Sequence, residues 1–363
     1  MSDEMDEEKG KTVNFFVGSY SDEGPYVLTA NGDGILSCTL DLKTGNIQKN
    51  SLCEEGVNAT YLDKSPNEKY LFAAIDRFSE IGSVSVFSIG SNGSLSQLST
   101  QPSHGKSTCH IASDRNGERI FLSSYMDSKL TAYNFDGSEI SPATEIITYE
   151  GSGPNVERQE DSHAHQAVVS PDNKWLYVCD LGSDKIWIHD MADLENIIRS
   201  IDVPPGYGPR HLVWNEPLNK SYVYCELNSH ILVYDWDQET GNMSLIEDIA
   251  ALPEEYEGQA AGSAIRIHPN HKALYVSDRG HNSIIVHSIG ESGKLKYESW
   301  FSIRGKTPRD FAVDPTGTWL LVANQDTDSI VPFRLDDESG LPVGEYASSF
   351  ECGTPVSIQF LTP

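Results

Sequence analysis

Short apolar runs separated by compact polar turns recur along the whole chain. The clearest copy runs from Ala167-Val-Val-Ser-Pro-Asp-Asn-Lys-Trp-Leu-Tyr-Val-Cys-Asp180 into the alternating segment Lys185-Ile-Trp-Ile-His-Asp190. Similar copies cover residues 265–287 and 311–333, and weaker ones start near Tyr61, Ile111 and Leu212. Each copy predicts two strands joined by a tight turn, a short polar loop and a third strand. Helical periodicity is almost absent, so the pattern indicates an all-β protein.

The repeat has a long and nearly constant period. The turn positions lie 46 to 56 residues apart, at Pro66, Arg115, Pro171, Pro217, Pro269 and Pro315. A period near 50 is typical of four-stranded propeller blades. Six complete units are visible, and residues 13–19 and 34–40 resemble a second and third strand without a first. Because residues 353–363 match a first strand, we predict a seven-bladed β-propeller with one blade closed by both chain ends, which leaves no open edge there.

Length and composition fit one large domain. The chain has 363 residues, of which 38% are hydrophobic, enough for a substantial core. We expect a single propeller domain over residues 12–363, preceded by a disordered acidic tail over residues 1–11. No run approaches the length of a membrane span, and the N-terminus is acidic where a signal peptide would be basic and then apolar. These features predict a soluble, cytoplasmic protein.

The charge is strongly negative, with 54 acidic and 26 basic side chains and a formal net charge of −28. Such a chain is repelled by phosphate backbones and anionic lipid surfaces, so we exclude nucleic acid and membranes as partners. The six cysteines are widely spaced and form no C-x-x-C pair. We therefore expect reduced, packed thiols and no zinc or redox centre.

The residues that carry chemistry gather at one end of the predicted channel. If each blade has strands A to D from the channel outward, the start of strand A and the loop between B and C lie on the same face. Only 11 arginines occur in the chain, and four of them fall at these positions, namely Arg77, Arg210, Arg279 and Arg309. Scarce cations concentrated in one funnel predict a pocket for a small anionic molecule. Arg266 lies inside a strand, where it is expected to bridge neighbouring blades.

Four segments at this mouth carry a family resemblance. Residues 151–165, 204–211, 277–283 and 307–311 resemble the seven-bladed propeller lactonase family, and the likeness extends from about Phe15 to Phe360. That family includes bacterial 6-phosphogluconolactonases and fungal 3-carboxy-cis,cis-muconate cyclases. The resemblance implies a hydrolase of a small anionic sugar lactone, with 6-phosphogluconolactone as the expected substrate in the pentose phosphate pathway. It implies no cofactor.

The family's proposed site is a histidine, two arginines and a glutamate, which match His163 or His165, Arg210, Arg279 and Glu226. Either Glu226 or a histidine would activate water, and the two arginines would stabilise the oxyanion or hold the substrate's anionic group. Substrate binding is assigned to six further mouth residues: Arg158, His110, His211, His281, Arg309 and Gln325. The chain departs from the family at Cys225, where asparagine is common, and at Ala264, where an acid is common.

Two alternative functions remain open. The same side chains could close a lactone ring, as a muconate cyclase does. A propeller can also serve as a protein-binding scaffold, although the repeated Trp-Asp signature is absent and Asp235-Trp236-Asp237 is a single instance.

His163 and His165 could contribute to a metal site only with a third ligand, and the nearby arginines disfavour a cation. We therefore predict no metal.

Overall fold

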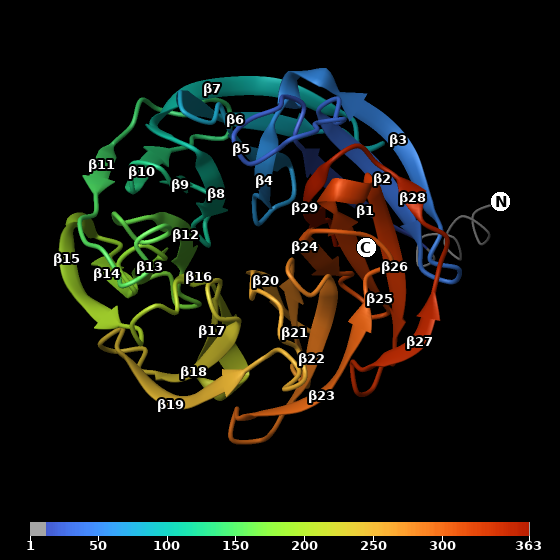
Figure 1. Ribbon diagram of the computed structural model, residues 1–363. Helices are drawn as coiled ribbons and strands as arrows, with labels where there is room; N and C mark the ends of the chain where they lie inside the picture. The colour runs from blue at the N-terminus through green and yellow to red at the C-terminus, as the bar shows by residue number, and fades with distance from the viewer. Residues whose placement is uncertain (1–11, 363) are drawn as a thin grey trace.

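The computed structural model describes residues 12–362, which form seven antiparallel sheets around a central channel (Figure 1). The predicted all-β, seven-bladed propeller is confirmed. The predicted tail over residues 1–11 lies outside the described residues. Within residues 12–362, helical structure is limited to three short 3-10 turns, η1 (Glu54–Gly56), η2 (Glu216–Leu218) and η3 (Gln325–Thr327). No helix within residues 12–362 has the length and apolar character of a membrane span.

The first three complete blades follow one another along the chain. One contains β4 (Ala59–Lys64), β5 (Tyr70–Ile75), β6 (Ile81–Ile89) and β7 (Leu95–Lys106). The next contains β8 (Thr108–Ser113), β9 (Arg119–Ser124), β10 (Lys129–Asn134) and β11 (Glu145–Thr148). The third contains β12 (Ala164–Val169), β13 (Trp175–Asp180), β14 (Lys185–Asp190) and β15 (Asp193–Asp202).

The remaining complete blades repeat the same order from the channel outward. The fourth contains β16 (Pro209–Asn215), β17 (Lys220–Cys225), β18 (His230–Trp236) and β19 (Met243–Ala250). The fifth contains β20 (Gly262–Ile267), β21 (Ala273–Asp278), β22 (Ser283–Ile289) and β23 (Leu295–Ser302). The sixth contains β24 (Pro308–Val313), β25 (Trp319–Asn324), β26 (Ser329–Leu335) and β27 (Pro342–Tyr346), with the short β28 (Phe350–Glu351) also paired to β26.

The seventh blade joins the two ends of the chain. It contains β29 (Pro355–Phe360), β1 (Thr12–Ser19), β2 (Ile35–Asp41) and β3 (Ile47–Cys53). β29 takes the channel position and pairs antiparallel with β1, so that Phe360 lies opposite Phe15 and Ile358 opposite Val17. The predicted closure is confirmed, and the ring has no open edge between its first and last blades.

The core lies between neighbouring blades. For example, Tyr177 and Cys179 on β13 pack with Leu212 and Val223 of the next blade. All six cysteines are free, and five are buried. Each fully buried aliphatic side chain contributes about 1.5–3 kcal/mol, so the sum over seven such seams favours a rigid ring. This rigid ring can hold the side chains at the channel mouth in fixed positions.

The innermost strand of every blade contains a β-bulge near its first residue. In β12, Ala164 lies opposite Asp180 and Gln166 opposite Cys179, so that His165 is the extra residue. The extra residues in the seven blades are Thr60, Cys109, His165, Arg210, the pair Ser263 and Ala264, Arg309 and Val356. Because a bulge interrupts the alternation of side chains, it can redirect one side chain toward a site.

Candidate active site

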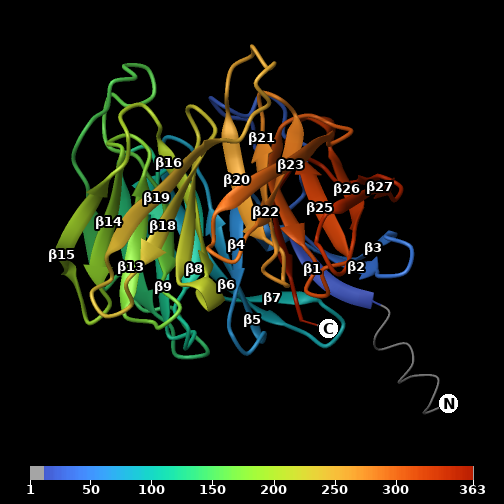
Figure 2. The same ribbon diagram turned by 90° about the horizontal axis from the view of Figure 1, so that it is seen from below.

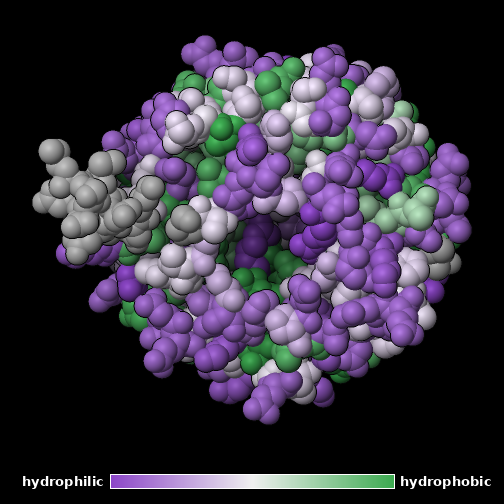
Figure 3. Space-filling view, turned by 180° about the vertical axis from the view of Figure 1, so that it is seen from behind, coloured by the Kyte–Doolittle hydropathy of each residue, from purple (hydrophilic) through white to green (hydrophobic). Residues whose placement is uncertain are grey.

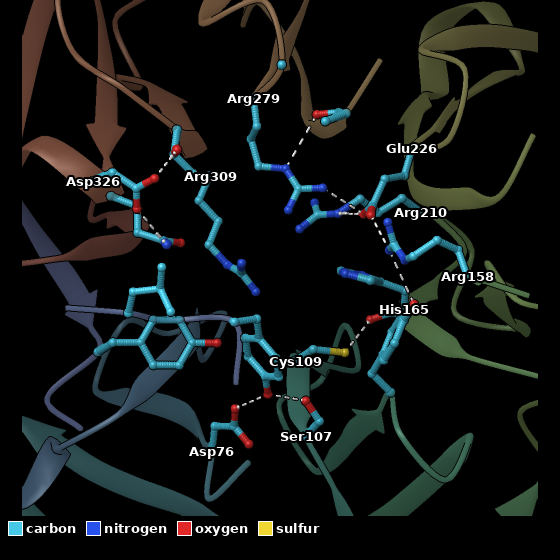
Figure 4. Close-up of a pocket in the computed structure, with 18 of the residues that line it drawn as sticks. Asp76, Ser107, Cys109, Arg158, His165, Arg210, Glu226, Arg279, Arg309 and Asp326 are labelled. Carbon is cyan, nitrogen blue, oxygen red and sulfur yellow. Dashed lines mark hydrogen bonds and ion pairs between the residues drawn. The ribbon is translucent and has the colours of Figure 1, made fainter. Parts of the chain in front are cut away.

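A cavity of about 690 Å³ opens at one end of the channel, and we call it the mouth cavity (Figure 4). It is lined by the starts of the innermost strands, the loops that follow each second strand, and longer connections. In the side view, the β11–β12 and β19–β20 connections project beyond the sheets on this face (Figure 2). The lining includes four arginines, Arg158, Arg210, Arg279 and Arg309, and three acids, Asp76, Glu226 and Asp326. The mouth therefore has the cationic character that the sequence predicts.

The bulges account for four of the lining side chains. Cys109, His165, Arg210 and Arg309 are all extra residues in their strands, and all four line the mouth cavity. They come from four different blades. The same local irregularity, repeated around the ring, thus brings together residues that are far apart in sequence.

Glu226 is the centre of an ion-pair cluster that also contains Arg158, Arg210 and Arg279. Its side chain is buried, and its Oε2 lies 3.0 Å from Arg210 Nε and 3.0 Å from Arg279 Nη2. Its Oε1 lies 2.5 Å from Arg158 Nη2. The backbone N–H of Glu226 donates to Gly208 O, which fixes the loop after β17. We call these four residues the Glu226 cluster.

The Glu226 cluster carries more positive than negative charge. Burial alone would raise the pKa of Glu226, but Arg279, Arg158 and Arg210 outweigh it and hold the pKa well below the usual value. Burial, followed by repulsion from Arg279, lowers the pKa of Arg210 to about 10. At neutral pH the glutamate is ionised and all three arginines are charged. One carboxylate therefore faces three guanidinium groups, an arrangement that attracts a further anion.

Arg279 is held by the loop on which it lies. Its backbone N–H donates to Ala261 O, and its Nη2 donates to Gly262 O at 3.1 Å. The preceding Asp278 accepts hydrogen bonds from the N–H groups of Ala261 and His281. A Cβ on the following Gly280 would lie only 1.9 Å from Gln259 O, so the close approach of the two segments requires glycine. The guanidinium is therefore oriented before any ligand binds.

The structure distinguishes the two histidines of the His-x-His segment. His165 lines the mouth cavity, and neither ring nitrogen has a hydrogen-bond partner within residues 12–362; its Nδ1 is buried. Burial and the nearby Arg210 lower its pKa well below the usual value, so the ring is neutral. His163 instead stacks on Tyr125 at 4.3 Å between ring centroids, with its Nδ1 3.0 Å from Tyr125 O, and does not line the cavity.

Three further histidines lie elsewhere than the sequence predicts. His211 and His110 are buried and do not line the mouth cavity; His211 Nε2 accepts a hydrogen bond from Arg210 Nη1 at 3.2 Å. His110 packs on Tyr61 and borders a second cavity of about 320 Å³ in the channel, which we call the far cavity. His281 packs between Tyr256 and Trp300. The expectation that these three side chains face the mouth is wrong. His110 and His211 each follow a bulged residue and point away from the mouth cavity, and His281 lies in the loop after β21 and is turned away from it.

The remaining predicted residues do line the mouth cavity. Arg158, Arg309 and Gln325 all contribute to its wall. Sequence reasoning missed the β1–β2 connection, which brings in Tyr20, Tyr26, Leu28 and Thr29, and also missed Ser107, Gln259 and Asp326. The β1–β2 connection belongs to the blade that is split between the chain ends, so it has no counterpart at a fixed offset in the other repeats. Nothing in the repeat pattern could have indicated it.

The chemistry of the lining favours an anionic ligand over a cation. Among residues 12–362, no group of three or more His, Cys, Asp or Glu side chains is arranged to hold a metal ion. Cys109 also lines the cavity, but burial raises the pKa of its thiol to about 12. The thiol stays protonated and is a poor nucleophile at neutral pH.

Comparisons with known proteins agree with this architecture. Residues 14–360 match the family described as "Lactonase, 7-bladed beta-propeller". The chain is 30% identical to a 6-phosphogluconolactonase of Bacillus subtilis, over 95% of this chain and 97% of that protein. It is 34% identical to a 6-phosphogluconolactonase of Formosa agariphila, over 90% of this chain and 93% of that protein.

A solved structure shows the same fold. The crystal structure of a protein from Lactobacillus plantarum superposes with a TM-score of 0.87 at 26% sequence identity, covering 96% of this chain and 99% of that one. Together with the family match over nearly the whole chain, these likenesses extend to every blade. The chain belongs to the seven-bladed β-propeller lactonase family.

Proposed function

We propose that the protein hydrolyses the ring ester of a small anionic sugar lactone, with 6-phosphogluconolactone as its substrate and 6-phosphogluconate as its product. The observation that carries this proposal is a buried glutamate held by three arginines beside a neutral histidine, all in one cavity. Two relatives that align over almost the whole chain are named 6-phosphogluconolactonases.

His165 is the proposed base. Both oxygens of Glu226 are engaged by guanidinium groups, whereas the ring nitrogens of His165 have no partner within the described chain. The neutral imidazole takes a proton from water as the water oxygen bonds to the lactone carbonyl carbon. Glu226 favours the charged form of His165, although burial and Arg210 oppose that form more strongly. The carboxylate therefore stabilises the imidazolium as it develops.

The arginines of the Glu226 cluster are the proposed oxyanion donors. Arg279 is fixed by Gly262 O and Arg210 by His211 and Glu226, so both are oriented before the carbonyl oxygen gains charge. When the tetrahedral intermediate collapses, the bond to the ring oxygen breaks, and that oxygen takes the proton from His165. The new carboxylic acid then ionises. In this scheme His110, His163, His211 and His281 do not contact substrate, and His211 is a positioning residue for Arg210.

The test is a direct assay of the purified protein with 6-phosphogluconolactone, followed by proton release against the spontaneous rate. We expect clear acceleration, and a loss of about 10³-fold in kcat/KM for Glu226→Gln, because the neutral amide cannot stabilise the imidazolium or hold the arginines. Glu254→Gln, an exposed residue on a neighbouring connection, is the matched control and should behave as the unchanged protein. No acceleration, or full activity in Glu226→Gln, would contradict the proposal. A parallel assay with 3-carboxy-cis,cis-muconate tests the cyclase alternative.

A further inference from the structure

Arg309 differs from the other arginines of the mouth cavity. Arg158, Arg210 and Arg279 all pair with Glu226, whereas Arg309 extends into the cavity from the opposite wall (Figure 4). Within residues 12–362, no carboxylate oxygen lies within 4.0 Å of its guanidinium. Its charge lies 5.6 Å from the centre of the Tyr20 ring, whose face attracts a cation only weakly. Arg309 is thus a cation in a recessed site without an anionic partner.

The acids nearest to this wall are already engaged elsewhere. Asp76 accepts hydrogen bonds from Tyr26 Oη at 2.9 Å and from the backbone N–H of Phe78 at 2.8 Å. Asp326 accepts from the hydroxyl of Thr307 and from Gln325 Nε2. Neither carboxylate therefore turns toward Arg309, and the guanidinium donors remain available to a ligand.

A second group beside Arg309 also lacks a partner. Gln325 follows Asn324, which lies opposite Pro308 in the paired strands β24 and β25, and both Gln325 and Arg309 line the mouth cavity. The Gln325 side chain is buried, with 6% of the residue exposed, and its Oε1 has no hydrogen-bond partner in the described chain. A buried amide oxygen is costly to leave unpaired. Because this oxygen has no exposed surface, the Gln325 amide must turn toward the cavity to accept a hydroxyl group of a ligand.

The distribution of charge decides which end of a phosphorylated lactone binds at the Glu226 cluster and which binds at Arg309. A phosphate dianion placed at the Glu226 cluster would lie against the Glu226 carboxylate. At Arg309 it meets an unpaired guanidinium, which can bind phosphate through two parallel hydrogen bonds. We infer that Arg309 binds the phosphate of the substrate, while Gln325 accepts a sugar hydroxyl and the ester end lies at Glu226 and His165. This inference rests on the proposed function, and it makes Arg309 the residue that selects phosphorylated over unphosphorylated lactones.

The experiment compares two lactones that differ only in the phosphate. Arg309→Gln should lower kcat/KM for 6-phosphogluconolactone by about 100-fold, mainly through KM, because charged hydrogen bonds to the phosphate are lost. The same variant should change kcat/KM for glucono-δ-lactone by less than about 3-fold. Arg77→Gln is the matched control, since Arg77 is a solvent-exposed arginine in the loop after β5 that pairs with Asp22 and does not line the cavity. It should leave both values unchanged.

A binding measurement separates this inference from the proposed function. Calorimetric titration with 6-phosphogluconate and with gluconate should show a preference for the phosphorylated acid that Arg309→Gln removes, whether or not the protein turns over either lactone. An inactive protein with this binding preference would contradict the proposed function and support the phosphate site. Equal losses for both lactones in Arg309→Gln, or a preference removed by Arg279→Gln but kept in Arg309→Gln, would overturn the inference.

Discussion

The two halves of the channel both contain buried arginines and acids, but in different proportions. In the mouth cavity three arginines pair with one glutamate, and Arg309 has no carboxylate partner among the described residues. On the opposite side, the face of the molecule is hollowed at its centre (Figure 3), and the far cavity is lined by Arg266 and Tyr61. There Arg266 Nη2 lies 2.7 Å from Asp310 and 3.1 Å from Tyr61 Oη. Asp63 also lines the far cavity and accepts hydrogen bonds from Ser113, so this half has one arginine and two acids.

The difference separates a structural ion pair from a ligand site. The far network joins strands from four blades, because Arg266 lies on β20, Asp310 on β24 and Tyr61 on β4, and Asp310 also accepts the backbone N–H of Ile358 on β29. Arg266 and Asp310 pair with each other without a ligand, as expected of groups that hold blades together. The excess of cations in the mouth cavity needs an external anion to balance it. Arg266 therefore bridges blades, as the sequence predicts, whereas the mouth arginines are available for chemistry.

The largest effect expected in this comparison concerns His165. His165→Gln should lower kcat/KM for 6-phosphogluconolactone by about 10²- to 10³-fold, because the proposed base is removed from the mouth cavity. His163→Gln is the matched control two residues away, and it should lower activity by less than about 3-fold per folded molecule. Steady-state assays, with the folded fraction taken from circular dichroism, measure both. Equal losses in the two variants would contradict the assignment of His165, rather than His163, as the base.

The next effect concerns stability, and it falls on the other half of the channel. Asp310→Asn should lower the free energy of unfolding by about 3 kcal/mol, because it leaves the buried Arg266 guanidinium without its counter-ion. The kcat/KM of the folded variant should stay within about 3-fold of the unchanged protein. Urea unfolding and lactone assays on the same preparation test this. A variant of normal stability that is as inactive as Glu226→Gln would show that the far network takes part in the reaction.

The architecture and the cationic mouth could be predicted from the sequence because both depend on fixed offsets. Alternating strands with turns about 50 residues apart give the blades and the closure by β29, and the ends of those strands place Glu226, Arg210, Arg279 and Arg309 near one another.

The depth and direction of individual side chains could not be predicted in this way. A bulge at the start of each innermost strand shifts the alternation by one residue, so His165 faces the cavity while His211, next to the bulged Arg210, does not. Strict alternation gives no sign of a bulge, and His163 and His165 therefore remained equivalent. The β1–β2 connection was missed for a different reason, since it is irregular and has no counterpart in the other blades.

The smallest expected effect is on the pH dependence of the reaction. The pKa of His165 is lowered by burial, then by Arg210, and to a lesser extent by Arg309, so its neutral, proton-accepting form persists below pH 6.5. For glucono-δ-lactone, which carries no titrating phosphate, kcat/KM corrected for spontaneous hydrolysis should be flat from about pH 6.5 to 8 and should fall only at lower pH. Removing a positive charge by Arg309→Gln raises the pKa of His165, so the acid limb should move to higher pH.

Asp310→Asn is the control from the other half of the channel. Asp310 is not among the largest contributors to the lowered pKa of His165, so the acid limb of this variant should stay close to its place in the unchanged protein. An inflection near pH 6.5 in the unchanged protein would indicate a base with an ordinary histidine pKa, and His165 would no longer fit that role. A limb that moves equally in Arg309→Gln and Asp310→Asn would mean that the two halves share one electrostatic environment. A shift confined to Arg309→Gln ties the proton-transfer step to the cations of the mouth cavity alone.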